Sequence, residues 1–247
     1  MRVAQYMKKS LRMNPLARKF RRDFYRISRN PYSIKSLQRE VALAKLSCVI
    51  DIGANVGQFA LDLRHSGFHG QIFSFEPISE IFTSLEKNST SDPNWNVVNL
   101  GISNIQGNQE IHVSGNDALS SSFLKINENH TSSFPNSDTK RMEMVKTDTL
   151  LNVLKEFGIS PENSLLKLDV QGLELSILKS LDNLVSAFPI IYLELSLTPL
   201  YEEEADFIEI LNYLKSHGHR VVDVFRGEVH RNMRLAQIDA ITLSIGN

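Results

Sequence analysis

The sequence predicts an α/β protein whose mostly parallel sheet is covered by helices on both faces. From residue 48 onward, short apolar strands alternate with amphipathic helices, an order typical of βαβ units. The first strand runs into a glycine-containing turn, DIGANVG at 51–57, and a later strand ends in the polar sequence DVQG at 169–172. Ligands of such sheets bind beyond the carboxyl ends of the strands, so both turns are candidate site segments.

The elements follow a regular order along the chain. Pro15 and Pro31 divide the N-terminal region, where we expect helices at 2–13, 15–28 and 33–46. The expected strands are 48–53, 71–77, 96–103, a short one from 143, 164–169, 189–196, 220–225 and 237–245. The expected helices are 56–66, 78–89, one ending near 158 with Thr147 or Asp148 as N-cap, 173–184 and 203–217. Residues 114–140 are rich in Ser, Asn, Asp and His, which favours a mobile loop.

Composition limits the class of protein. The chain has 247 residues, of which 42% are hydrophobic and 22% charged, which is ordinary for a soluble globular protein with a full core. Its single cysteine, Cys48, excludes an internal disulfide and a multi-cysteine zinc site, and it fits a reducing compartment. No apolar run approaches the ~20 residues that cross a bilayer, and no secretory signal is evident. We therefore expect a cytoplasmic protein, with peripheral binding at the inner membrane face as an option.

Positive charge is concentrated at the N-terminus. Residues 1–45 contain thirteen Lys or Arg and two acidic residues, a net charge of +11, whereas the remainder carries −12. We interpret 1–45 as a basic, helical N-terminal segment and 46–247 as the main domain. Such a segment favours contact with a polyanion or an anionic membrane surface, for instance a lipid-linked glycan. The alternative is a helical cap that packs on the domain.

The turn at 51–57 suits a nucleoside without phosphate. Gly53 and Gly57 leave room where backbone approaches a ligand, and Asn55 tolerates a left-handed conformation. The spacing is G-x-N-x-G rather than the G-x-G-x-x-G of dinucleotide-binding enzymes, and the Asp51 carboxylate would repel a phosphate. Glu76 ends the second strand, where an acidic group in such folds takes ribose hydroxyls. A cationic nucleoside such as S-adenosylmethionine meets these requirements, and a tight turn of an unrelated α/β protein is the alternative.

Several motifs resemble those of the FkbM family of methyltransferases. They are VIDIGANVGQFA, FSFEP, ALSSSF at 118–123, VKTDTLL, LLKLDVQGLELSILKSL and IIYLELS, in that order over roughly residues 48–245. The family is similar in fold to class I methyltransferases, so the resemblance implies a Rossmann-like sheet of seven strands with the last one antiparallel. It also implies transfer of a methyl group to a hydroxyl of a sugar, a glycan or another small natural product. Residues 1–45 lie outside the resemblance.

The resemblance also implies which residues bind the cofactor S-adenosylmethionine. The methionine part would be lined by Asp51, Gly53, Ala54, Asn55 and Gly57, the ribose held by Glu76 and Pro77, and the adenine placed near Ile102 and Ser103. Asp169 would approach the methionine end and the transferred methyl group.

Two carboxylates at neighbouring strand ends, Asp169 and Glu194, suit this chemistry. A sugar hydroxyl is a poor nucleophile, so a base or a metal must take its proton during attack. We hypothesise that Asp169, alone or with Glu194, orients and deprotonates the acceptor. Lys167 shares a strand face with Asp169, and we expect a structural salt bridge between them. Strand-end carboxylates also suit Mg²⁺, but the sequence shows no certain third ligand, so we expect no metal site.

Two other functions stay open at this point. The basic N-terminal segment fits an RNA ribose methyltransferase, although the aromatic stacking motifs of RNA-binding modules are missing, so nucleic acid is not the expected partner. A non-catalytic scaffold that binds the cofactor is the second alternative, against which the acidic groups at both strand ends argue. His130 falls in the predicted loop that would cover the acceptor. The acceptor, the choice between O- and N-methylation and the oligomeric state stay open.

Overall fold

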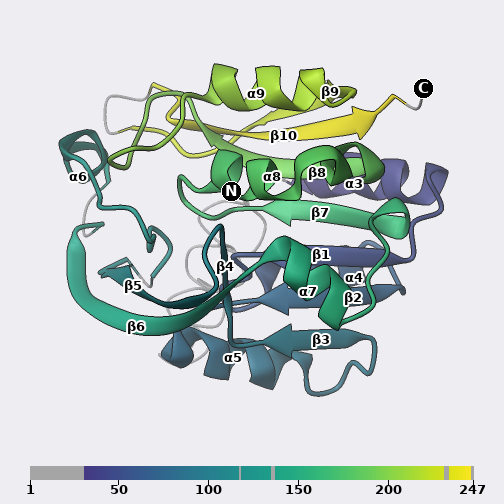
Figure 1. Cartoon of the computed structure of the whole chain (residues 1–247), viewed down its shortest axis with the longest axis horizontal. Coiled ribbons are helices and arrows are strands. Elements are labelled where there is room, and N and C mark those ends of the chain that lie inside the picture. Colours follow the sequence, from purple (N-terminus) through teal and green to yellow (C-terminus); the bar gives the residue numbers. More distant parts are fainter. Residues whose placement is uncertain (1–30, 117, 135–136, 231–233, 246–247) are drawn as a thin grey trace, which may run out of the picture.

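The structure is a computed structural model that describes residues 31–116, 118–134, 137–230 and 234–245. The helices expected at 2–13 and 15–28, and with them most of the basic N-terminal segment, lie outside the described residues. From residue 31 to the end of the last strand, the chain forms two sheets and their covering helices (Figure 1).

The central sheet has seven strands in the order β3-β2-β1-β7-β8-β10-β9. Their bounds are β1 Cys48–Ile52, β2 Gln71–Phe75, β3 Trp95–Val98, β7 Ser164–Leu168, β8 Ile190–Ser196, β9 His219–Arg226 and β10 Gln237–Ser244. The pairs β1–β2, β2–β3, β1–β7 and β7–β8 are parallel, while β10 runs antiparallel to both β8 and β9. The predicted fold class, a mostly parallel seven-stranded sheet with an antiparallel last strand, is confirmed.

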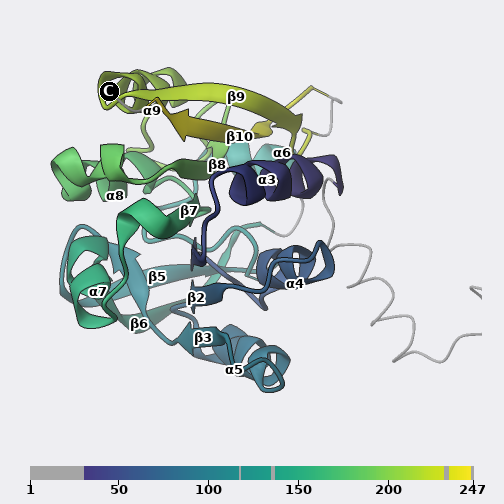
Figure 2. The same cartoon turned by 90° about the vertical axis from the view of Figure 1, so that its right-hand side faces the viewer.

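Helices cover both faces of this sheet (Figure 2). One face carries α3 Pro31–Leu43, α4 Gln58–His65 and α5 Ser79–Ser89, and the other carries α7 Leu150–Glu156, α8 Glu174–Leu181 and α9 Phe207–Ser216. Short 3-10 helices span Pro161–Asn163 and Asp182–Ala187. The two layers explain why every residue of β7 and β8 is buried, since a strand covered on both faces needs apolar side chains on each.

Strand alternation divides the core into two clusters. In β1, Ile50 and Ile52 join the cluster under α7, α8 and α9, whereas Val49 joins the cluster under α3, α4 and α5. Leu37 and Val41 of α3 belong to the second cluster and are almost completely buried. Burying side chains of this size stabilises the fold by about 1.5 to 3 kcal/mol each. The boundary proposed at residue 45 stays a prediction, but α3, which precedes it, shares the core of the main domain.

A second, three-stranded sheet lies beyond the carboxyl ends of the parallel strands (Figure 1). It contains β4 Gly101–Ser103, β5 Gly107–Ser114 and β6 Thr139–Thr149 in the order β4-β6-β5. The single strand expected at 96–103 is therefore split between the two sheets. Asn99 lies at the break, where its side-chain amide donates hydrogen bonds to the carbonyls of Glu76 and Pro77. The N-cap of α7 is Thr149, which accepts from the Asn152 amide, rather than Thr147 or Asp148.

The expectation of a mobile loop at 114–140 was wrong for much of the segment. It contains the short helix α6, Glu128–Ser133, whose N-cap Asn127 accepts a hydrogen bond from the His130 amide. Ile126 forms a β-bridge with Tyr201, and both side chains are buried in one small apolar cluster. A contact between residues 75 positions apart gives no local signal in a polar sequence, which explains the error.

Candidate active site at the carboxyl ends of the strands

The turn after β1 has the left-handed backbone that its sequence predicts. The φ angles of Gly53, Asn55 and Gly57 are 74°, 50° and 91°. A Cβ on Gly53 would lie 1.9 Å from the carbonyl oxygen of Asp169, and one on Gly57 would lie 2.6 Å from the Trp95 ring. Contacts within the protein therefore already require both glycines, and their role in the approach of a ligand stays a prediction.

Glu76 closes the turn from the neighbouring strand. Its two carboxylate oxygens accept hydrogen bonds from the backbone amides of Asn55 and Ile78, each at 2.9 Å. Burial raises the pKa of Glu76 to about 7, against the lowering effect of these two amides. Because a carboxylate oxygen has two acceptor positions, each oxygen keeps one for a hydroxyl group.

Asp51 faces Lys167 inside the protein. The Asp51 side chain has no exposed surface, and its Oδ1 lies 3.0 Å from Lys167 Nζ. Lys167 also donates to the carbonyls of Ile52 and Gly53, at 3.2 and 2.8 Å. Burial opposes the charge of Lys167, but Asp51 and then Asp169 outweigh it and raise the pKa of this lysine. The charge of Asp51 is thus balanced by Lys167, and its role at the cofactor stays a prediction.

Asp169 and Glu194 are brought together by a residue that lies between them. Asp169 Oδ1 accepts from Gln171 Nε2 at 2.8 Å, and the same nitrogen donates to Glu194 Oε2 at 2.9 Å. Asp169 Oδ2 lies 3.5 Å from Lys167 Nζ, so the expected salt bridge is present. The Asp169 side chain is 29% exposed, so it can reach a bound ligand.

These contacts belong to one polar row that crosses six strands of the central sheet. In sheet order the row contains Trp95 of β3, Ser74 of β2, Asp51 of β1, Lys167 of β7, Asp169 and Gln171 after β7, Glu194 of β8 and Gln237 of β10. Successive partners lie 2.8 to 3.5 Å apart. Parallel strands end at the same edge, so side chains far apart in sequence meet there.

Two acids, the buried Glu174 and the half-buried Glu204, shape the turns next to the row. Glu174 accepts from the amides of Val170 and Gly172, at 3.1 and 3.0 Å, and burial raises the pKa of Glu174 to about 8. Glu204 accepts from the amides of Leu200 and Tyr201 and fixes the turn that carries the tyrosine. Burial, and next the charge of Glu204, raise the pKa of Tyr201 well above its ordinary value, so its hydroxyl stays a donor.

The other residues assigned to the cofactor are mostly covered. Ala54, Ile102 and Ser103 are buried, and Pro77 is half-buried. The hydroxyl of Ser103 accepts from Gln109 Nε2 at 2.7 Å and donates to the carbonyl of Ile105. A role of these residues at the adenine stays a prediction.

His130 is buried beside Tyr201, which contacts Gln171 of the row. Its Nε2 is 3.1 Å from Ser120 Oγ, and its ring packs edge-on against the rings of Phe134 and Tyr201. Burial lowers the pKa of His130 to about 4, so the ring is neutral near pH 7. The sequence did not identify Gln171, Tyr201 or Gln237 as site residues. Only Gln171 carried a signal, its place in the DVQG turn.

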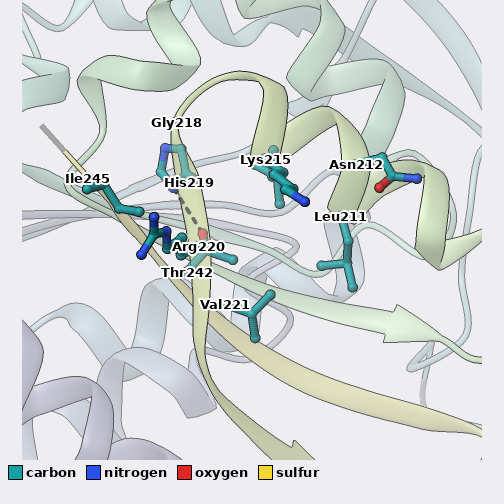
Figure 3. A pocket seen from close by; sticks show the side chains of 10 residues that line it. Leu211, Asn212, Lys215, Gly218, His219, Arg220, Val221, Thr242 and Ile245 are labelled. Atoms are coloured by element: carbon teal, nitrogen blue, oxygen red, sulfur yellow. Dashed lines mark hydrogen bonds between the residues drawn. The ribbon is translucent and has the colours of Figure 1, made fainter. Parts of the chain in front are cut away.

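A separate groove of about 580 Å³ lies at the opposite edge of the sheet (Figure 3). It runs between α9 and the start of β9 and includes Lys215, His219 and Arg220. His219 is already bonded to Thr242 and to the carbonyl of Val185. None of the residues predicted for the site lines this groove, and we place the chemistry at the polar row instead.

The described residues lack two features. They contain no group of three His, Cys, Asp or Glu side chains arranged to hold a metal ion. Among the helices of the same residues, none is long and apolar enough to span a membrane.

The strand order, the antiparallel β10 and the acids at the strand ends define a class I, Rossmann-like, S-adenosylmethionine-dependent methyltransferase. The model of the methyltransferase FkbM domain matches residues 51–221. The chain therefore belongs to the FkbM methyltransferase family. A search of curated protein sequences gave no match.

Solved structures share the fold at low sequence identity. A provisionally named O-methyltransferase from Klebsiella pneumoniae has a TM-score of 0.52 and 12% identity, with 99% of this chain and 96% of that chain covered. Magnesium protoporphyrin IX methyltransferase from Synechocystis PCC 6803, with bound S-adenosylmethionine, has a TM-score of 0.47 and 9% identity over 86% of this chain and 78% of that chain. Fibrillarin from Aeropyrum pernix, also with bound S-adenosylmethionine, has a TM-score of 0.42 and 10% identity, with 80% of this chain and 66% of that chain covered. These similarities concern the fold alone.

Proposed function

We propose that this protein is an S-adenosylmethionine-dependent O-methyltransferase that acts on a hydroxyl of a sugar, a glycan or another small natural product. The observation that carries the proposal is the half-buried Asp169, held next to Glu194 at the carboxyl ends of β7 and β8. A hydroxyl acceptor needs a group that takes its proton, and carboxylates in a fixed position provide one.

The residues of the first turn fit the cofactor. Glu76 keeps an acceptor position on each oxygen for the ribose hydroxyls, and the left-handed turn 53–57 places backbone rather than bulky side chains at the strand end. Asp169, the most exposed carboxylate of the row, offers a negative charge for the cationic methionine end. When bound, S-adenosylmethionine supplies an electrophilic methyl group.

The protein contributes position and proton transfer. Asp169 orients the acceptor hydroxyl for in-line attack, and Asp169 or Glu194 takes its proton as the oxygen–methyl bond forms. Holding both reactants in line lowers the barrier by several kcal/mol, of order 7 to 11 in the best intramolecular cases. Lys167 and Gln171 keep the Asp169 carboxylate in place from two sides.

The test is Asp169→Asn, with transfer and binding measured separately. Transfer of a labelled methyl group to a panel of sugars, nucleotide sugars and small hydroxylated natural products should fall by about 10² or more. Calorimetric affinity for S-adenosylhomocysteine should stay within about tenfold. Glu209→Gln, which removes an exposed acid paired with Lys179, is the matched control and should leave both quantities unchanged.

Full turnover by Asp169→Asn would eliminate the assignment of Asp169 as base. Methylation of RNA ribose by the wild type, lost on addition of salt and with no small hydroxyl acceptor used, would replace the proposed acceptor class with nucleic acid. Binding of S-adenosylmethionine without turnover on any acceptor would favour a non-catalytic role.

A further inference from the structure

Gln171 joins the two carboxylates through a single nitrogen. A side-chain amide has two N–H groups, and in this structure Nε2 lies 2.8 Å from Asp169 Oδ1 and 2.9 Å from Glu194 Oε2. One N–H is therefore available to each carboxylate. The contact is between side chains of β8 and of the turn after β7, two elements that the sheet places side by side.

The orientation of this amide is fixed from the other side. Tyr201 donates its hydroxyl to Gln171 Oε1 at 2.7 Å, and Ser122 Oγ donates to the backbone carbonyl of Gln171 at 2.7 Å. A flipped amide would turn Oε1 toward two carboxylates, which is repulsive, and Tyr201 would keep only the Ser120 carbonyl, at 3.1 Å, as an acceptor. The hydrogen-bond network thus selects the orientation in which Gln171 donates to both acids.

The backbone at this position favours glycine, yet a glutamine is present. Gln171 has φ 54°, a left-handed conformation that costs a non-glycine residue about 1 kcal/mol or more. Glu174 holds the turn in this shape through the amides of Val170 and Gly172. Glycine would adopt the same shape without strain, so the strain points to a role of the glutamine side chain.

Acidic groups outnumber basic ones around the two acids. Among the residues that the structure describes, these groups include Lys167 of β7, Asp51 of β1, Glu174 of α8, Tyr192 of β8, Glu204 and Tyr201 of the 199–206 segment, and Asp239 of β10, which pairs with Glu194 in register. Lys167 is the one cation of this set. Two neighbouring carboxylates in such a field tend to share a proton unless donors stabilise both ionised forms.

We propose that Gln171 is a positioning residue that keeps Asp169 and Glu194 both ionised, so that either one can receive the proton of the acceptor hydroxyl. The inference rests on the proposed function, because it takes these two carboxylates as the proton acceptors. It adds a role that the FkbM match and the fold do not assign to any residue.

Two variants of the full chain test this role. Gln171→Met keeps the length of the side chain without its N–H groups, and Gln171→Gly removes the side chain while relieving the backbone strain. The readout is a carboxyl ¹³C NMR titration with S-adenosylhomocysteine present, with the two signals assigned through Asp169→Asn and Glu194→Gln. In both variants the higher of the two apparent pKa values of the pair should rise by roughly one unit or more. The acid limb of the methyl-transfer pH profile should move to higher pH by the same amount.

The matched control is Gln106→Met. Gln106 donates to Asp148 at 3.0 Å on the exposed edge of the second sheet, so this variant also removes an amide–carboxylate bond. It should leave the titration of Asp169 and Glu194 unchanged. Unchanged titration curves in Gln171→Met and Gln171→Gly would overturn the proposal, whatever the stability of the variants. Because the titration needs no acceptor, it decides the role of Gln171 even if no hydroxyl acceptor is methylated and the proposed function fails.

Discussion

The turn 53–57 with Glu76 forms the cofactor half of the proposed site, and Asp169, Gln171, Glu194 and Tyr201 form the acceptor half. In the cofactor half, the polar contacts are mostly to backbone: Glu76 accepts two amides, and Lys167 donates to two carbonyls. In the acceptor half, the contacts are between side chains from three separate segments. A local turn thus fixes one half, whereas the packing of distant segments fixes the other.

The largest effect is expected from Lys167→Met, because Lys167 joins the two halves. The substitution leaves Asp51 buried without its cation, and breaking a buried pair costs about 3 to 5 kcal/mol. Urea denaturation measures the loss. Lys179→Met, at an exposed pair with Glu209, should cost under about 1 kcal/mol.

Asp51→Asn combined with Lys167→Met removes both charges and should recover part of the lost stability. Equal losses of unfolding free energy in Lys167→Met and Lys179→Met would show that the buried ion pair of Lys167 does not join the two halves.

The next effect concerns the point where the backbones of the two halves meet. Gly53→Ala places a Cβ 1.9 Å from the Asp169 carbonyl at φ 74°, so the two turns must move apart. We expect a loss of roughly 3 kcal/mol in unfolding free energy. The affinity for S-adenosylhomocysteine, measured by calorimetry, should fall more than about tenfold.

Gly158→Ala is the control for backbone strain alone. Gly158 has φ 63° and no atom within 4 Å of an added Cβ, so this change should cost only about 1 to 2 kcal/mol. If Gly53→Ala and Gly158→Ala cost similar unfolding free energy and the cofactor affinity stays intact, the close approach of Gly53 to the Asp169 carbonyl is not a feature of the site.

The last effect, which is small for a change of one pH unit, is the dependence of stability on pH. The folded-state pKa values of Glu76, about 7, and Glu174, about 8, lie above the ordinary 4.5. The folded protein therefore holds more protons than the unfolded chain above pH 4.5, so stability falls as pH rises toward 7 or 8. Each group contributes up to ~1.4 kcal/mol per pH unit.

Urea unfolding at pH 5, 6, 7 and 8 tests this dependence. Glu76→Gln should make the decrease in unfolding free energy less steep below pH 7 and keep most of the decrease between pH 7 and 8. Glu174→Gln should remove the decrease between pH 7 and 8. Each Gln variant is less stable overall, because an amide cannot accept both backbone bonds, so the slope is the quantity to compare. Retention of the wild-type slope in both variants would contradict the assignment.

Local patterns were sufficient to predict much of the cofactor half. Asn55 and the two glycines predicted a left-handed turn, and Glu76 was expected at the end of its strand. The structure has both features. Period-two alternation also predicted that Lys167 and Asp169 share a face. The distribution of charge could not be predicted in the same way, since the partner of Asp51 depends on which strand lies beside β1.

By itself, the sequence determined the α/β class, the order of the strands along the chain and the two turns at which the site forms. These follow from local periodicity and backbone preference, which act over a few residues. Only the tertiary structure decided that Gln171 links Asp169 to Glu194 and that Tyr201 and Gln237 join them. It also decided that Ser120 and Ile126 contact Tyr201. Such contacts unite residues up to 81 positions apart, and burial decides their energies, so no local pattern encodes them.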